Sequence, residues 1–124
     1  MQTPKDVRLP RRPTVLVVDD DDAIRDVVSE VLRDEGYDVA CAANGEQALA
    51  ALRRECPPDL MLLDLMMPVM SGWELLEQLQ EHAGMCTTKI VVVSAMASPG
   101  HWEHLAKPID LGRLLDTVKH LTAG

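Results

Sequence analysis

Side chains that can bind a cation or a phosphoryl group follow the short apolar runs of this sequence. They are, in chain order, Asp19, Asp20, Asp64, Ser94 and Lys107. Carboxylates brought together at one place repel each other unless a cation lies between them, and oxygen ligands favour Mg²⁺. Once Mg²⁺ and the Lys107 ammonium neutralise the acids, a phosphoryl group can approach a carboxylate and contact the Ser94 hydroxyl. These residue types therefore predict a magnesium site that supports phosphoryl transfer.

The elements that must position these residues alternate between apolar runs and segments of helical period. We expect strands at 15–18, 39–42, 60–63, 90–93 and, as a short fifth strand, 104–106. Amphipathic helices are expected at 24–32, 44–52, 71–79 and 110–121. Three of the strands are apolar throughout rather than alternating, so both faces of their sheet must be covered. The pattern predicts a doubly wound α/β sandwich whose site lies at the carboxyl ends of parallel strands.

Length and composition limit what else the chain can do. Its 124 residues suffice for one domain with its own core. Residues 1–13 carry four basic side chains and one acidic one, which leaves a net charge of −11 for residues 14–124. We expect a disordered basic arm followed by a single domain. The acidic domain repels phosphate backbones and has few aromatic residues for stacking, so we expect no nucleic-acid binding by it.

The cysteines and apolar runs indicate a cellular compartment. The three cysteines are odd in number and widely spaced, which favours a reducing environment over a disulfide framework. No apolar run approaches the length of a membrane span, and no apolar segment typical of a signal peptide lies near residue 1. We therefore expect a cytoplasmic protein that binds no membrane.

The ordered set of motifs resembles the receiver domain of two-component response regulators over residues 14–121. The motifs are Val18-Asp19-Asp20, Asp64 followed by Met67-Pro68-Val69-Met70-Ser71-Gly72, Ser94-Ala95 and Lys107-Pro108. The resemblance implies a flavodoxin-like five-stranded parallel sheet of order 2-1-3-4-5 and a cis Lys107-Pro108 bond. It also implies a phosphorelay switch rather than a metabolic enzyme.

The resemblance further implies a role for each site residue. Asp64 would accept a phosphoryl group from a phosphohistidine of a sensor histidine kinase or histidine phosphotransfer protein. Lys107 would pair with the phosphoryl oxygens, and Ser94 would move to hydrogen-bond them. The ligands of Mg²⁺ would be Asp19, Asp20, Asp64 and the main-chain carbonyl of Met66. The downstream target is not indicated.

One segment departs from the family pattern. Only residues 95–106 separate Ser94 from Lys107, where the family places a loop, a fourth helix and the fifth strand. Because a proline and a glycine interrupt this segment, we expect the fourth helix to be missing or reduced to a turn. The sheet face left uncovered would bind a partner or form a homodimer interface, with Trp102 covering part of it.

Two substitutions at family positions predict altered behaviour. The residue three before Lys107 is aromatic in the family and is His104 here, so we expect phosphorylation to persist while its relay to the usual output surface is altered. Met66 and Met96 occupy the positions that flank the attacking water in the family. Because apolar side chains cannot orient that water, we expect a long-lived acyl phosphate.

Other interpretations stay open from the residues alone. Asp21 and Asp22 are expected to cap the first helix, and His101 with His104 supplies too few ligands for zinc. A pseudo-receiver, which is an interaction module that takes no phosphate, is the main alternative because of the missing helix. An aspartyl phosphatase of the haloacid-dehalogenase type would use Asp19 and Asp21, but the chain leaves no room for a substrate cap.

Overall fold

The computed structural model describes residues 12–54, 56–67, 69–81, 87–95 and 102–123. The strands are β1 (Thr14–Val18), β2 (Asp38–Ala42), β3 (Leu60–Asp64), β4 (Lys89–Ser94) and β5 (Glu103–Ala106). The helices in this part of the chain are α1 (Asp22–Asp34), α2 (Gly45–Leu52), α3 (Gly72–Glu81) and α4 (Leu111–Thr122). The expected disordered arm falls almost wholly on residues 1–11, which lie outside the described residues.

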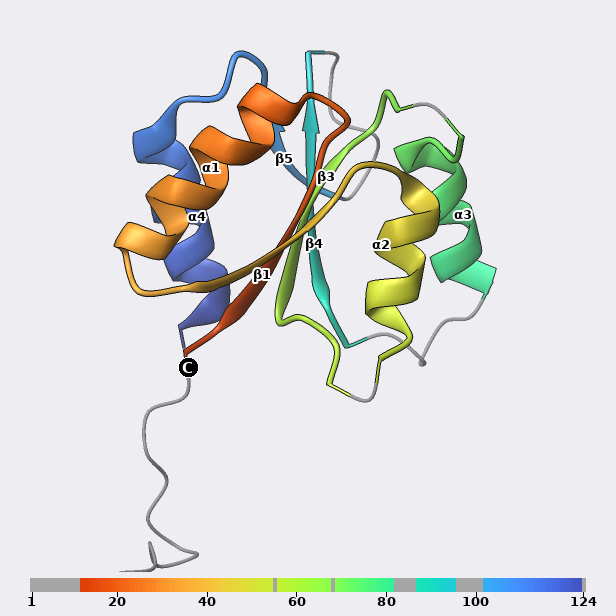
Figure 1. The fold of residues 1–124 in the computed structure, drawn as a ribbon, viewed down its shortest axis with the longest axis horizontal. Helices are drawn as coiled ribbons and strands as arrows, with labels where there is room; N and C mark the ends of the chain where they lie inside the picture. Colours follow the sequence, from red (N-terminus) through yellow and green to blue (C-terminus); the bar gives the residue numbers. More distant parts are fainter. Residues whose placement is uncertain (1–11, 55, 68, 82–86, 96–101, 124) are drawn as a thin grey trace, which may run out of the picture.

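The five strands form one parallel sheet of order β2-β1-β3-β4-β5 (Figure 1). This confirms the flavodoxin-like order 2-1-3-4-5. The third and fourth strands run one residue further than the apolar pattern predicts, because Asp64 pairs with Val93 and Ser94 pairs with Ala106. Both polar site residues therefore lie inside the sheet ladder, at its last positions, rather than in the following loops.

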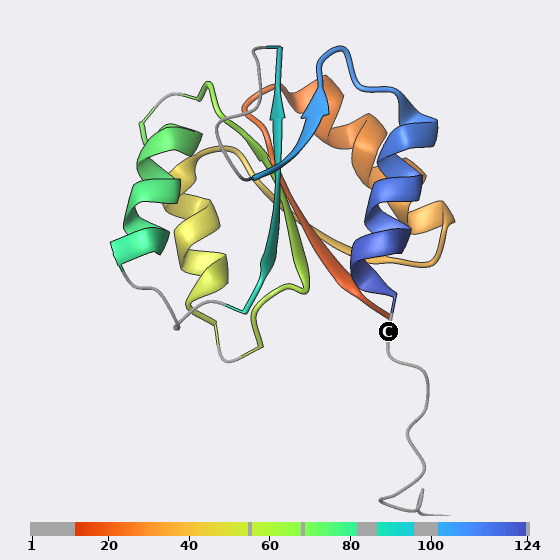
Figure 2. The same cartoon turned by 180° about the vertical axis from the view of Figure 1, so that it is seen from behind.

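Two helices cover each face of the sheet. Figures 1 and 2 show α1 and α4 on one side and α2 and α3 on the other. Strand residues alternate between the two layers because successive side chains point to opposite faces. Those beneath α1 and α4 include Val15, Val17, Leu62, Val91 and Val93. Those beneath α2 and α3 include Leu16, Val18, Met61, Leu63 and Val92. The doubly wound sandwich is confirmed.

Polar caps place the starts of the helices near the carboxyl edge of the sheet. The capping carboxylate or amide oxygens accept main-chain N–H hydrogen bonds of 2.9–3.1 Å: Ala23 to Asp21, Gln47 to Asn44, and Arg113 to Asp110. Gly36, with φ of 95°, follows the end of α1, where a residue without a side chain adopts this conformation at little cost. These local signals fix the starts of α1, α2 and α4 and the end of α1.

The connection from β4 to β5 is too short for the usual crossover helix. β4 ends at Ser94 and β5 begins at Glu103, yet the two strands pair in parallel. The four helices of the described residues are consistent with a fourth family helix that is missing or reduced. Trp102 packs against the core beneath α2 and α3, as expected for a side chain covering part of that face. No helix in the described ranges is long and apolar enough to cross a membrane.

Candidate functional site

Asp19 is the first residue after β1, and each of its polar groups forms a hydrogen bond. Its side chain is buried, and Oδ1 accepts a hydrogen bond from the N–H of Asp21 at 2.9 Å. Oδ2 accepts one from Lys107 Nζ at 3.1 Å. Its own N–H donates to the Ala42 carbonyl at 3.1 Å, and its carbonyl accepts from Arg25 Nη1 at 2.6 Å. The Asp19 carboxylate therefore has one defined orientation.

Asp64 ends β3 and is 4% exposed. Its Oδ1 accepts a hydrogen bond from the N–H of Met66 at 3.1 Å, and its Oδ2 lies 3.4 Å from Lys107 Nζ. Gly72 packs directly on the main chain here, since a Cβ at that position would lie 2.4 Å from the Asp64 carbonyl oxygen. The glycine that ends the loop motif is needed for this close approach.

Lys107 joins the two buried acids from the end of β5. Its N–H donates to the Ser94 carbonyl at 3.0 Å, which continues the pairing of β5 with β4. The following bond to Pro108 is cis, as the resemblance implies. From this position the ammonium contacts the carboxylates of Asp19, which follows β1, and of Asp64, which ends β3.

Burial dominates the electrostatics of the site. It raises the pKa of Asp64, and the negative charge of Asp19 adds to the rise, while the Met66 N–H and the Lys107 ammonium oppose it. Burial lowers the pKa of Lys107, but hydrogen bonding to Asp19 and the charges of both carboxylates outweigh it and raise that pKa overall. Lys107 is therefore a cation at neutral pH, and the site still favours further positive charge.

The carboxylates suit a hard divalent cation. Oxygens of Asp19, Asp20 and Asp64 lie within 4.8 Å of one another. The Asp20 side chain is exposed whereas the other two are buried, so the cluster opens to solvent on one side. All-oxygen ligands with a solvent-facing side fit Mg²⁺, which keeps several of its waters. A cation here would also favour the charged form of Asp64.

One pocket of about 320 Å³ brings the predicted site residues together. Its lining comprises Asp19, Asp20, Asp21, Ile24, Asp64, Met66, Ser94, Ala95 and Lys107. Ser94 is buried at the end of β4, and the exposed Met66 side chain stands at the rim. Met96, the second residue expected beside the attacking water, lies outside the described residues. Arg25 was not singled out from the sequence, although its i, i+3 spacing from Asp22 was a visible signal.

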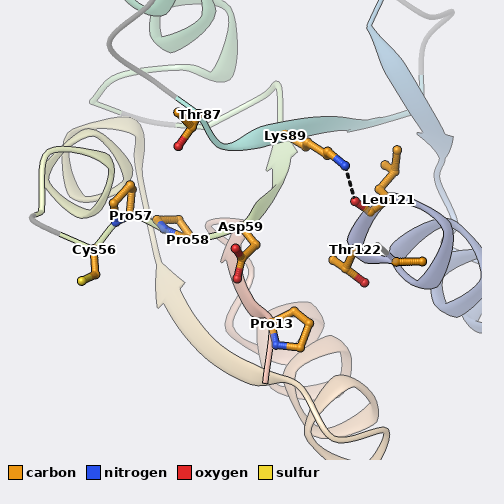
Figure 3. A pocket seen from close by; sticks show the side chains of 10 residues that line it. Pro13, Cys56, Pro57, Pro58, Asp59, Thr87, Lys89, Leu121 and Thr122 are labelled. Atoms are coloured by element: carbon orange, nitrogen blue, oxygen red, sulfur yellow. Dashed lines mark hydrogen bonds between the residues drawn. The ribbon is translucent and has the colours of Figure 1, made fainter. Parts of the chain in front are cut away.

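A larger pocket, of about 500 Å³, lies at the opposite edge of the sheet (Figure 3). Its two charged side chains, those of Lys89 and Asp59, already form hydrogen bonds with main-chain groups of the fold. Lys89 Nζ donates to the Leu121 carbonyl at 2.6 Å, and Asp59 accepts from the Thr14 N–H at 2.8 Å. The size of a cavity therefore does not locate the chemistry, whereas the convergence of charged groups at the carboxyl edge does.

The two histidines expected to supply too few ligands for a zinc site cannot be compared in the structure, because His101 lies outside the described residues. Among those residues, the group of potential metal ligands is the three-acid cluster. Asp21 caps α1, as expected, because its carboxylate accepts hydrogen bonds from the N–H groups of Ala23 and Ile24. Asp22 lies in the first turn and pairs with Arg25.

Comparisons with known proteins agree with this fold. A sequence model of the response regulator receiver domain family matches residues 15–119. The chain is 38% identical over 114 residues to the DNA-binding response regulator MtrA of Mycolicibacterium smegmatis, covering 87% of this chain and 50% of MtrA. The chain thus spans about half the length of this curated relative.

Solved structures show the same fold over most of their length. The chemotaxis response regulator CheY4 of Vibrio cholerae has a TM-score of 0.78 and 32% identity, covering 90% of this chain and 99% of CheY4. A CheY-like receiver domain protein from Methanospirillum hungatei has a TM-score of 0.77 and 32% identity, covering 89% and 93% of the two chains.

Proposed function

The chain belongs to the response regulator receiver domain family, and on this premise we propose that residues 14–124 are a switch phosphorylated on Asp64. Receiver domains act as signalling switches and interact with histidine kinases or phosphotransfer proteins. The proposed donor is a phosphohistidine of one of these. The supporting observation is the buried Asp64 carboxylate, which lies 3.4 Å from the Lys107 ammonium and has an oxygen within 4.8 Å of carboxylate oxygens of Asp19 and Asp20.

In the proposed transfer, a carboxylate oxygen of Asp64 attacks the phosphorus atom. The new O–P bond forms as the P–N bond breaks, and the donor imidazole leaves with the bonding electron pair. Lys107 is placed to offset the negative charge on the transferred oxygens, because its ammonium already lies 3.4 Å from Asp64 Oδ2. Ser94, at the end of the neighbouring strand, offers its hydroxyl to the same oxygens.

Magnesium would supply the positive charge that three acids and a phosphoryl group require. The residues that would hold it are Asp19, Asp20, Asp64 and the main-chain carbonyl of Met66. The spacing of the carboxylate oxygens supports this assignment.

An apolar groove beside the acids is the proposed docking surface for the phosphoryl donor. The groove has a volume of about 340 Å³ and is lined by Ala23, Ile24, Val27, Val28, Lys107, Pro108, Ile109 and Leu111. Ile24 and Lys107 also line the acid pocket, so the two cavities adjoin. Val27 is 49% and Leu111 38% exposed, although both are apolar. A protein that packs on them can present its histidine to Asp64.

The two alternatives differ in which residue would be labelled. In the phosphatase alternative, Asp19 would be labelled and Asp21 would be the second acid of the motif, but the Asp21 carboxylate is occupied in capping α1. The pseudo-receiver alternative predicts no labelling, although both buried acids and Lys107 are in contact. The geometry therefore favours phosphorylation of Asp64.

The relay beyond Asp64 is proposed to be altered. His104 Nε2 is buried and has no hydrogen-bond partner among the described residues, so the residue that replaces the family's aromatic brings a buried polar atom to this position. Chemical-shift changes on adding a phosphoryl mimic should stay near the acid pocket. Changes that spread over β5 and α4 would refute this. The homodimer expected at the uncovered face can be tested by measuring the mass in solution.

Intact-mass measurement after incubation with acetyl phosphate and Mg²⁺ tests the proposal. The wild-type chain should gain one phosphoryl group, whereas Asp64→Asn and a metal-chelated sample should gain none. Lys107→Met should be labelled much more slowly. Labelling that persists in Asp64→Asn and disappears in Asp19→Asn would support the phosphatase, and no labelling of the wild type would support the pseudo-receiver.

A further inference from the structure

Arg25 is a cation beside the acid cluster that the proposed transfer does not use. It lies in the first turns of α1, and its side chain is 17% exposed. Nη1 donates to the main-chain carbonyl of Asp19 at 2.6 Å, and Nη2 pairs with the Asp22 carboxylate. The guanidinium thus bridges the start of the acidic loop to the start of the helix.

The carbonyl that Arg25 contacts belongs to the peptide unit between Asp19 and Asp20. A peptide unit is nearly planar, so its orientation affects the direction of both flanking side chains. The preceding peptide unit is held separately, because its N–H, that of Asp19, donates to the Ala42 carbonyl at 3.1 Å. The unit between Asp19 and Asp20 therefore cannot rotate without losing its charge-assisted hydrogen bond to Arg25.

We propose that Arg25 is a positioning residue for the magnesium site. It fixes the peptide between Asp19 and Asp20 so that both carboxylates face the same cation as Asp64. This inference rests on the proposed function, since it concerns how that site is held. Arg25 does not touch the cation, the phosphoryl group or the reacting oxygen.

The contact with the carbonyl matters more than the contact with Asp22. The Asp22 side chain is 84% exposed, and exposed ion pairs contribute little. The Asp19 carbonyl is part-buried, and the bond to it is short. A lysine keeps the charge, but its single ammonium lacks the planar fork that spans both partners.

If Arg25 acted only through its charge, replacing it by a neutral residue would strengthen Mg²⁺ binding, whereas loss of a positioning residue would weaken it. Removing a cation beside a cluster of acids strengthens the attraction of Mg²⁺ to that cluster. Loss of positioning weakens binding, because the two carboxylates no longer converge. Groups that orient metal ligands without touching the metal typically change affinity by about 10–100-fold when they are removed. The direction of the change therefore separates the two explanations.

Calorimetric titration of the full chain with Mg²⁺ tests the proposal in wild type, Arg25→Gln and Arg25→Lys. Both variants should bind Mg²⁺ roughly tenfold more weakly. Arg54→Gln removes the same charge from an exposed position beyond the end of α2 and should bind like the wild type. Asp22→Asn should change the Kd by less than about threefold, because exposed ion pairs contribute little.

A second readout is the Mg²⁺ dependence of labelling by acetyl phosphate. The half-saturating Mg²⁺ concentration should rise in both Arg25 variants, while the rate at saturating Mg²⁺ stays near that of the wild type. Tighter binding by Arg25→Gln, or unchanged binding by Arg25→Lys, overturns the positioning role and leaves the proposed function intact. A wild-type chain that binds no Mg²⁺ overturns both. If Arg25→Gln does not fold, the Arg25→Lys result decides.

Discussion

The Lys107 ammonium lies 3.4 Å from Asp64 Oδ2, yet the pKa of Asp64 is raised. Burial is the largest cause and the charge of Asp19 adds to it, so one lysine and the Met66 N–H do not offset them. The folded protein therefore holds the Asp64 proton more tightly than the unfolded chain, whose carboxyl titrates near 3.8. The resulting stabilisation is present at low pH and is lost as the pH rises from 3.8 through the higher folded pKa.

Replacing Asp64 by Asn should stabilise the protein at neutral pH without Mg²⁺, since the amide carries no charge to bury. Urea unfolding should give Asp64→Asn the higher free energy of unfolding, and the difference should shrink as the pH approaches 3.8. Added Mg²⁺ should stabilise the wild type more than the variant. Equal stabilities across this pH range would contradict the account of Asp64 as a charge that is costly to bury.

Gly72→Ala should destabilise the protein by about 1–3 kcal/mol, the usual cost of overpacking. The added Cβ would lie 2.4 Å from the Asp64 carbonyl oxygen, where main chain rather than a flexible side chain must move. Gly112→Ala is the matched control, because its Cβ would meet only the Asp110 side chain, at 3.2 Å. Urea unfolding should show a loss for the first variant and little change for the second.

The acyl phosphate on Asp64 should be long-lived because of Met66. This side chain is 66% exposed at the rim of the acid pocket and has no group that orients water well. Met66→Gln places an amide there and should speed loss of the phosphoryl group about tenfold. This is less than the roughly 10²–10⁴-fold rate increase typical of a full general acid or base.

The measurement is the decay of intact-mass label after acetyl phosphate is removed, with Mg²⁺ present. Val69→Gln is the control, because Val69 is exposed in the same loop but does not line the pocket. Loss of the wild-type label within seconds would show that Met66 does not protect it.

Much of the fold and site could be predicted because the signals are local. Apolar runs such as 60–63 predict buried strands, and Asp21, Asn44 and Asp110 cap the helices that follow them. Parallel strands bring their carboxyl ends to one edge, so Asp64 and its partners could be expected to meet. Their burial, which sets the direction of the pKa shift, depends on packing from both layers.

Other features depend on the path of the backbone and could not be predicted. The bond from Arg25 to the Asp19 carbonyl requires a particular turn between β1 and α1. Val69 has φ of 69°, a left-handed conformation that β-branched residues avoid, so no propensity indicates it. The parallel pairing of β5 with β4 across a short connection was expected from the family resemblance, but no local signal indicates it, because it depends on the whole sheet.

The docking groove should matter for phosphotransfer from a protein but not from a small molecule. Val27→Asp places a charge on an apolar side chain that is 49% exposed beside the acid pocket, so a donor packing there must bury that charge. Transfer from a phosphorylated histidine kinase domain that labels the wild type should fall by at least about tenfold, equal to 1.4 kcal/mol of binding. Labelling by acetyl phosphate should stay unchanged because that donor needs no protein surface.

Ala50→Asp adds the same charge to an exposed position of α2, on the other side of the sheet, and should leave both reactions unaffected. An equal loss with both donors would instead mean that Val27→Asp disturbs the neighbouring Asp64 site, and an equal loss in Ala50→Asp would point to the charge of the whole domain.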